Sequence, residues 1–131
     1  MEFSFPWPFT QGEWLAWGSA AATVLFGLVF LFLPRVALRI LRLQPTEAHP
    51  EAVAEARSTM SGFYLGVGLT CILFAQPFLY MALGFSWLFT AFGRLVSMLS
   101  DRGNTVYNWV SLVLELVLAG LPLAFAFGFI A

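Results

Sequence analysis

The chain has 131 residues, of which 60% are hydrophobic and only 10% are charged, and its mean hydropathy is +0.86. A soluble domain is about 45–50% apolar and about a quarter charged, and a chain this short could not bury so much apolar surface in water. Disorder is excluded because it needs low hydrophobicity and high charge. The composition predicts an integral membrane protein, and a net charge of -1 gives no sign of nucleic-acid binding.

The first predicted span covers about residues 14–33, because no charged residue lies between Glu13 and Arg35. About 20 apolar residues suffice to cross a hydrocarbon core of about 30 Å. Residues 1–12 precede this span and lack the basic region of a signal peptide, and their aromatic residues suggest an anchor at the membrane interface.

A charged segment follows the first span. Arg35, Arg39 and Arg42 are spaced by four and three residues, which places them on one face of a short amphipathic helix in the headgroup region. A polar loop follows, and Pro50 is suited to the first position of a helix that leads into the second span. We expect the whole segment 35–57 to lie in the cytoplasm.

Three further spans are predicted at about residues 59–75, 78–99 and 106–127. Pro77 marks the turn before the third span, and residues 101–104 (Asp-Arg-Gly-Asn) form the turn before the fourth. The sequence thus predicts a single all-α membrane domain over residues 1–131, a bundle of four transmembrane helices. The alternative is three spans, with the second and third merged into a re-entrant hairpin, because Pro77 leaves only a short connection.

The arginines predict the orientation of the bundle. With four spans, both termini lie on one side, which carries Glu2 and Glu13 but no Lys or Arg. The opposite side has nearly all the positive charge, in Arg35, Arg39, Arg42, Arg57 and Arg102. The positive-inside rule therefore places both termini outside and the polar loop in the cytoplasm.

Two charged residues, Arg94 and Glu115, fall within predicted spans. Ionisable groups inside a membrane are costly and mark candidate functional sites. At about 1.5 Å per residue, both lie roughly 10–15 Å from the turn that joins their helices. We therefore expect them to pair across this hairpin.

Further polar residues recur at helical spacing near this pair, and we expect them to form an intramembrane cluster with it. Its candidate members are Ser97, Asp101, Asn108, Ser111 and, from a third helix, Arg57. The pair either fastens two helices together, or Glu115 titrates or binds a cationic or polar ligand in a cavity open to the cytoplasm.

Small residues mark the predicted helix contacts, since they let backbones approach closely in lipid. In the first span they are Ser19, Thr23 and Gly27, and in the second Gly62 and Gly66. Packing within the chain is the favoured use of these stripes, and a dimer interface is the alternative.

The sequence lacks the residue sets that membrane enzymes and metal sites need. His49 is the only histidine and Cys71 the only cysteine, so no metal-ligand cluster is predicted. We interpret His49 as a solvated loop residue and Cys71 as a small buried hydrophobe. No catalytic residue and no cofactor are predicted, although a bound lipid is possible.

A family resemblance is carried by Arg57, Gly62 and Gly66, then by Gly93-Arg94-x-x-Ser97-x-x-x-Asp101, and then by Glu115. From about residue 57 to the C-terminus, the chain resembles a group of short four-span bacterial membrane proteins known as a domain of unknown function. The resemblance implies a bundle in the bacterial inner membrane, whose termini would then lie on the periplasmic side, and it transfers no activity.

Two functions follow as hypotheses. The leading one is a non-enzymatic accessory or stabilising subunit that associates with membrane lipids and with a larger membrane complex or with itself. The alternative is a small transporter or a lipid- or ligand-binding bundle, with Glu115, Asn108, Ser111 and Tyr107 around a cavity. An enzyme acting on lipid or isoprenoid substrates is a minor third possibility, based on location alone.

Overall fold

The computed structural model describes residues 5–44 and 51–130, and all regular structure in these ranges is helical. His49 and Pro50 of the polar loop, and Glu2 of the N-terminal segment, lie outside the described residues. The helices are α1 (Gln11–Phe32), α2 (Pro34–Ile40), α3 (Glu51–Glu55), the π-helical turn η1 (Ala56–Met60), α4 (Ser61–Phe74), α5 (Pro77–Ser100) and α6 (Val106–Ala126).

Residues at the helix ends explain several of these bounds. The Thr10 side chain caps α1 by accepting a hydrogen bond from the Glu13 N–H, and the Glu13 carboxylate accepts one from the Phe9 N–H. Ala75 ends α4 in the left-handed conformation (φ 50°), and Pro77 opens α5 at its first position. The predicted turn between the second and third spans is therefore present.

Three helices, α1, α5 and α6, are long and apolar enough to cross a membrane, which indicates a membrane protein. The sequence predicted four such helices, and the predicted span 59–75 is the one that falls short. α4 has 14 residues, or about 21 Å of helix, because the backbone widens into the π-helical turn η1 just before it.

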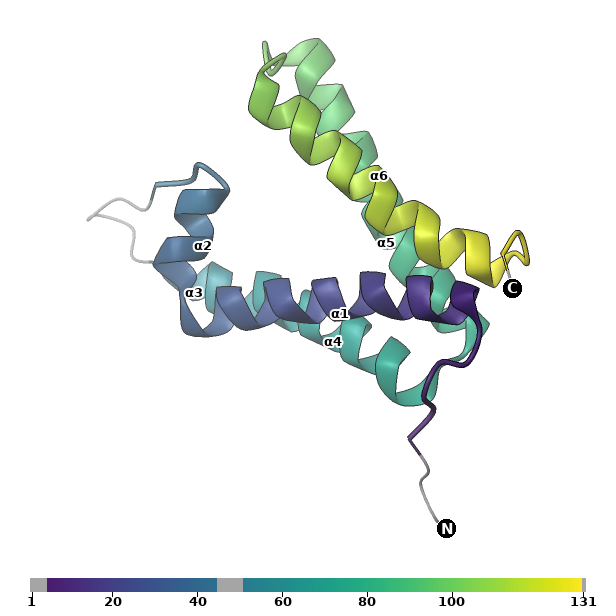
Figure 1. The fold of residues 1–131 in the computed structure, drawn as a ribbon. Helices are drawn as coiled ribbons and strands as arrows, with labels where there is room; N and C mark the ends of the chain where they lie inside the picture. The colour runs from purple at the N-terminus through teal and green to yellow at the C-terminus, as the bar shows by residue number, and fades with distance from the viewer. Residues whose placement is uncertain (1–4, 45–50, 131) are drawn as a thin grey trace.

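The long helices form two antiparallel hairpins, α1 with α4 and α5 with α6 (Figure 1). The hairpins meet near the start of α1 and the end of α6, and they diverge toward α2 and the α5–α6 turn (Figure 1). We call these regions the closed end and the open end. The central core lies at the closed end and is made of Ala16, Ala20, Cys71, Tyr80, Leu83, Trp87, Leu118 and Ala119.

At the open end the buried residues divide between the two sides of the opening. Phe30 of α1 packs with Ala37 and Leu38 of α2 and with Ala56 of η1. Ala91, Met98 and Leu112 form a separate cluster within the α5–α6 hairpin. The predicted amphipathic helix is present as α2, since Ala37 and Leu38 join the first cluster while Arg35 and Arg39 are exposed. It is shorter than predicted, because it ends at Ile40 before Arg42.

Close contacts between small residues hold the first hairpin together. Gly27 of α1 faces Leu65 so closely that a Cβ atom at Gly27 would lie 3.0 Å from the Leu65 backbone nitrogen. Gly68 of α4 faces α1 in the same way, since a Cβ atom at Gly68 would lie 3.0 Å from the Ala20 carbonyl oxygen. The Ser61 hydroxyl donates to the Gly27 carbonyl at 3.0 Å. The hairpin thus packs backbone against backbone, as small residues permit in lipid.

The predicted packing stripes have different outcomes in the two helices. Ser19, Thr23 and Gly27 of α1 are buried at helix contacts, as expected. Gly62 and Gly66 of α4 are exposed, and a Cβ atom on either would meet nothing within 4 Å. The prediction that they pack within the chain is wrong, because α4 turns Ser61 and Gly68 toward α1 instead.

Candidate functional site

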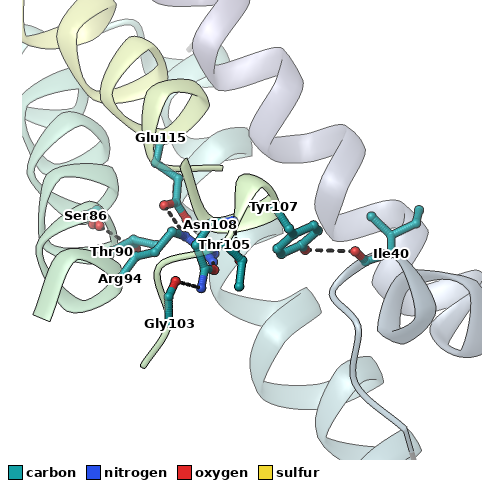
Figure 2. Close-up of polar contacts among 9 residues, drawn as sticks. All are labelled: Ile40, Ser86, Thr90, Arg94, Gly103, Thr105, Tyr107, Asn108 and Glu115. Carbon is teal, nitrogen blue, oxygen red and sulfur yellow. Dashed lines mark hydrogen bonds and ion pairs between the residues drawn. The ribbon is translucent and has the colours of Figure 1, made fainter. Parts of the chain in front are cut away.

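The centre of the candidate site is an ion pair between α5 and α6 (Figure 2). Arg94 Nε donates to Glu115 Oε1 at 2.7 Å, and Arg94 Nη2 donates to Glu115 Oε2 at 3.1 Å. This two-bond geometry is the strongest form of an arginine–carboxylate contact. The predicted pairing of Arg94 with Glu115 is therefore present in the structure.

Asn108 is the third member of this cluster. Its side-chain oxygen accepts from Arg94 Nη1 at 2.8 Å, while its amide nitrogen donates to the Gly103 carbonyl at 2.7 Å. The Thr105 hydroxyl caps α6 by accepting from the Asn108 N–H at 3.2 Å. Asn108 thus connects the ion pair to the α5–α6 turn, as Figure 2 shows.

The two charges differ in their exposure. The Glu115 side chain is 7% exposed, whereas that of Arg94 is 22% exposed. Both Glu115 oxygens accept hydrogen bonds from Arg94, which holds the carboxylate in one position. The three hydrogen bonds that Arg94 donates do not use all the N–H groups of its guanidinium. The remaining N–H groups can donate to a group in the space beside Arg94.

That space is a cavity of about 390 Å³ between the two hairpins. Apolar residues form most of its wall, and Arg94, Glu115 and Ser111 bring polar atoms to it. Leu25 and Leu114 line the cavity and are exposed, so it opens to the side of the bundle. Its volume falls within the roughly 300–1,000 Å³ of ligand pockets.

A stack of aromatic rings lines the inner end of the cavity. The Tyr64 ring lies 5.5 Å from that of Phe30 and 5.6 Å from that of Trp87, both in stacked geometry. Trp87 Nε1 donates to the Thr23 hydroxyl at 2.9 Å, which fixes its indole at the closed end. Packed side chains from α1, α4 and α5 therefore build this wall.

Tyr107 bridges the two sides of the open end. Its hydroxyl donates to the Ile40 carbonyl of α2 at 2.8 Å, reaching across from α6 (Figure 2). The Arg42 guanidinium lies 4.9 Å from the centre of the Tyr107 ring, a cation–π contact. Both Tyr107 and Ile40 line the cavity and Ile40 is exposed, so this bridge borders an opening of the cavity at the open end, which we call its mouth.

Other predicted members of the cluster lie elsewhere. Arg57 is exposed in η1, and within the described residues no ion pair or hydrogen bond joins it to Arg94 or Glu115. Asp101 is exposed just after α5, where its N–H donates to the Ser97 carbonyl, and in the described residues neither side chain is bonded to Arg94 or Glu115. The helix bearing Arg57 belongs to the other hairpin, which diverges from α5 and α6 at this end.

Sequence reasoning missed three contacts that shape the site. These are the Trp87–Thr23 hydrogen bond, the Tyr107–Ile40 bridge and the close approach of Gly84 to α6. The sequence did carry a signal for the Gly84 contact, because Gly84 lies seven residues before Ala91, on the face of α5 that also carries Trp87. The two hydrogen bonds join residues 64 and 67 positions apart and had no local signal.

Among the described residues, no group of three or more His, Cys, Asp or Glu side chains could hold a metal ion. Cys71 is buried, and its thiol donates to the Leu79 carbonyl at 3.2 Å.

The fold and the site define an all-helical protein with three helices able to cross a membrane and an ion pair beside an internal cavity. The chain belongs to the family of the domain of unknown function DUF4345, whose family model matches residues 12–126. This match is wider than the resemblance from residue 57 onward, because it includes α1 and α2. Neither the curated proteins nor the solved structures contain a match to the chain.

Proposed function

We propose that the protein binds an amphiphilic ligand, a lipid or a lipid-like molecule, in the cavity between its two hairpins. The observation that carries this proposal is the composition of the cavity wall, which is apolar along its length with a fixed ion pair at one side. The chain of the ligand would lie against Phe26, Val29 and Leu114, and its polar group would accept from the free N–H groups of Arg94.

The ion pair supports binding rather than catalysis. Glu115 is buried and held by two hydrogen bonds, so it neutralises Arg94 and leaves the cavity without net charge. A cavity of this kind favours a ligand with an apolar chain and a hydrogen-bond acceptor. We therefore infer a non-enzymatic role, in which the pair both joins α5 to α6 and orients the ligand.

We further propose a four-helix arrangement in a bacterial inner membrane, with both termini outside. α4 packs antiparallel to α1, and it continues α3 and η1 into a helical run from Glu51 to Phe74. That run is about 36 Å long, enough to cross beside α1 with its charged first turns at the interface. The exposed arginines gather at the open end, which would then face the cytoplasm.

A second candidate function is the accessory subunit, and the exposed stripe on α4 favours it. Gly62 and Gly66 make no close contact within the chain, and with Ser58 and Thr70 they line a groove of about 510 Å³. Such a surface suits close approach by another transmembrane helix. Cross-linking from Phe63 in the source membrane would detect that neighbour.

The binding proposal is tested by filling the cavity. Ser111→Phe places a ring in the space beside Arg94, and Val113→Phe on the exposed side of α6 is its matched control. Native mass spectrometry would measure bound cis-parinaric acid, a fatty-acid probe, after gentle extraction. We expect Ser111→Phe to lose the probe while Val113→Phe and the unmodified protein retain it. Equal occupancy in all three proteins would contradict the proposal.

A further inference from the structure

Three arginines at the end of the first hairpin gather around one hollow at the open end. Arg35 and Arg39 of α2 and Arg42, in the turn just after this helix, line the hollow of about 470 Å³ together with Leu43 and Gln44. The four-residue spacing of Arg35 and Arg39 places them on one face of α2, and Arg42 has a left-handed backbone (φ 60°) beyond its end. The opposite face carries Ala37 and Leu38 into the core, which holds α2 in one orientation.

None of these arginines has a carboxylate partner among residues 5–44 and 51–130, where the Arg94–Glu115 contact is the one ion pair. Arg42 does have a fixed position, because its guanidinium lies over the Tyr107 ring. Arg35 and Arg39 are exposed, and their side chains make no hydrogen bond or ion pair in the same ranges. The hollow therefore presents unneutralised guanidinium groups on a helix whose other face is packed.

We propose that this hollow binds the phosphate group of an anionic phospholipid. Guanidinium groups match phosphate oxygens with paired hydrogen bonds, which is why arginine predominates in phosphate recognition. The inference rests on the membrane placement under the proposed function, because α2 then lies in the headgroup layer where lipid phosphates are found. It does not depend on what occupies the cavity.

The position of Arg42 also relates the hollow to the cavity. Arg42 lines the hollow and contacts Tyr107, and Tyr107 lines the cavity. A phospholipid bound at α2 would therefore lie beside the mouth of the cavity. Because Arg42 touches both sites, the variants that test the hollow are made at Arg35 and Arg39.

The experiment places the full-length protein in nanodiscs of phosphatidylcholine with a minor share of phosphatidylglycerol. Native mass spectrometry then measures the ratio of the two lipids released with the protein. The test variant carries Arg35→Gln and Arg39→Gln. Its matched control carries Arg57→Gln and Arg102→Gln, which remove the same charge from two exposed arginines that have no ion pair in the described residues.

We expect the unmodified protein and the control to release phosphatidylglycerol in excess of its share. In the test variant, this enrichment of phosphatidylglycerol should fall about tenfold, as expected for the loss of hydrogen bonds to a charged group. Arg35→Lys with Arg39→Lys should keep an intermediate enrichment, because lysine retains the charge without the paired geometry. Absence of enrichment in the unmodified protein, or an equal loss in both double variants, would overturn the proposal.

Two further arms complete the test. Inorganic phosphate added to the nanodiscs should leave the enrichment unchanged, and its loss would assign the hollow to a soluble anion instead of a lipid. Ser111→Phe should also leave the enrichment unchanged, because that residue lines the cavity and not the hollow. If the cavity does not bind its fatty-acid probe, the expected phosphatidylglycerol enrichment is unaffected. Each proposal can therefore be contradicted without the other.

Discussion

The two ends of the bundle are built from different interactions. At the closed end, α1, α4, α5 and α6 share one core, and side-chain hydrogen bonds cross between helices. At the open end, each hairpin has a small core of its own, and the space between them is the cavity. The charged pair within the helices lies at the open end.

This difference shows how a small membrane protein can keep a cavity without losing its fold. Small residues at the closed end allow four helices to converge, and dispersion attraction between the closely packed helices holds both hairpins together there. The hairpins can then separate at the open end because each is fastened internally, the first by Gly27 and Ser61 and the second by Arg94 and Glu115. Substitutions at either end of the bundle test this difference between the two ends.

The largest effect is expected for Gly84→Leu at the closed end. A Cβ atom at Gly84 would overlap the Leu123 side chain and lie 3.0 Å from the Ala119 carbonyl oxygen. Overpacking of this kind costs about 3 kcal/mol. Thermal unfolding in detergent measures the loss, and Gly93→Leu on the same helix, where nothing lies within 4 Å, is the control. Equal stability of the two variants would show that this contact does not hold the hairpin.

The next effect is expected for Glu115→Gln at the open end. Removal of one partner of a buried ion pair costs roughly 3–5 kcal/mol, and the partial exposure of Arg94 reduces this to about 2 kcal/mol. The double variant Arg94→Leu with Glu115→Leu should lose less unfolding free energy than the summed losses of its two single variants, Arg94→Leu and Glu115→Leu. Additive losses in unfolding free energy would mean that the two residues do not act as a pair.

A smaller effect is expected for Ser19→Ala. The Ser19 hydroxyl donates to the Leu118 carbonyl at 2.6 Å and joins α1 to α6. Hydrogen bonds between membrane helices contribute about 0.6 kcal/mol on average, and we expect a loss of that size in unfolding free energy. Ser86→Ala is the control, because Ser86 is exposed and bonds within its own helix. A loss as large for Ser86→Ala would mean that the hydrogen bond between α1 and α6 is not the source of the effect.

The smallest effect on stability is expected for Tyr107→Phe. This change removes the hydrogen bond to the Ile40 carbonyl and costs about 0.5 kcal/mol. Its consequence for the cavity should be clearer, since the bridge across the mouth is lost. The fluorescence of cis-parinaric acid should report faster dissociation of the probe than from the unmodified protein. An unchanged rate would mean that the bridge does not limit ligand exit.

The sequence predicted the parts of this structure that depend on local pattern. Composition and long apolar runs located α1, α5 and α6, and helical spacing placed Arg94 opposite Glu115 across a short turn. The length of α4 was not predictable, because the π-helical turn before it has no marker in the sequence. The rotation of α4, which turns Gly68 inward and Gly62 outward, depends on its contacts with α1.

The cavity could not be predicted from local sequence pattern either. The sequence placed polar residues near Glu115 but predicted that Arg57 would join them from a third helix. That expectation assumed a bundle packed evenly along its length. The divergence of the hairpins arises from tertiary packing at the closed end, and it separates Arg57 from the pair.

The central claim is that the hairpins enclose a ligand site at the open end, and inter-helix distances test it most directly. Double electron–electron resonance would use a Cys71→Ala background with spin labels at Val36 and Val106 across the open end. A second label pair at Leu15 and Phe127 reports on the closed end. Addition of cis-parinaric acid should narrow the distance distribution at the open end and leave the closed end unchanged. An open-end distribution that does not respond to saturating probe would contradict the account.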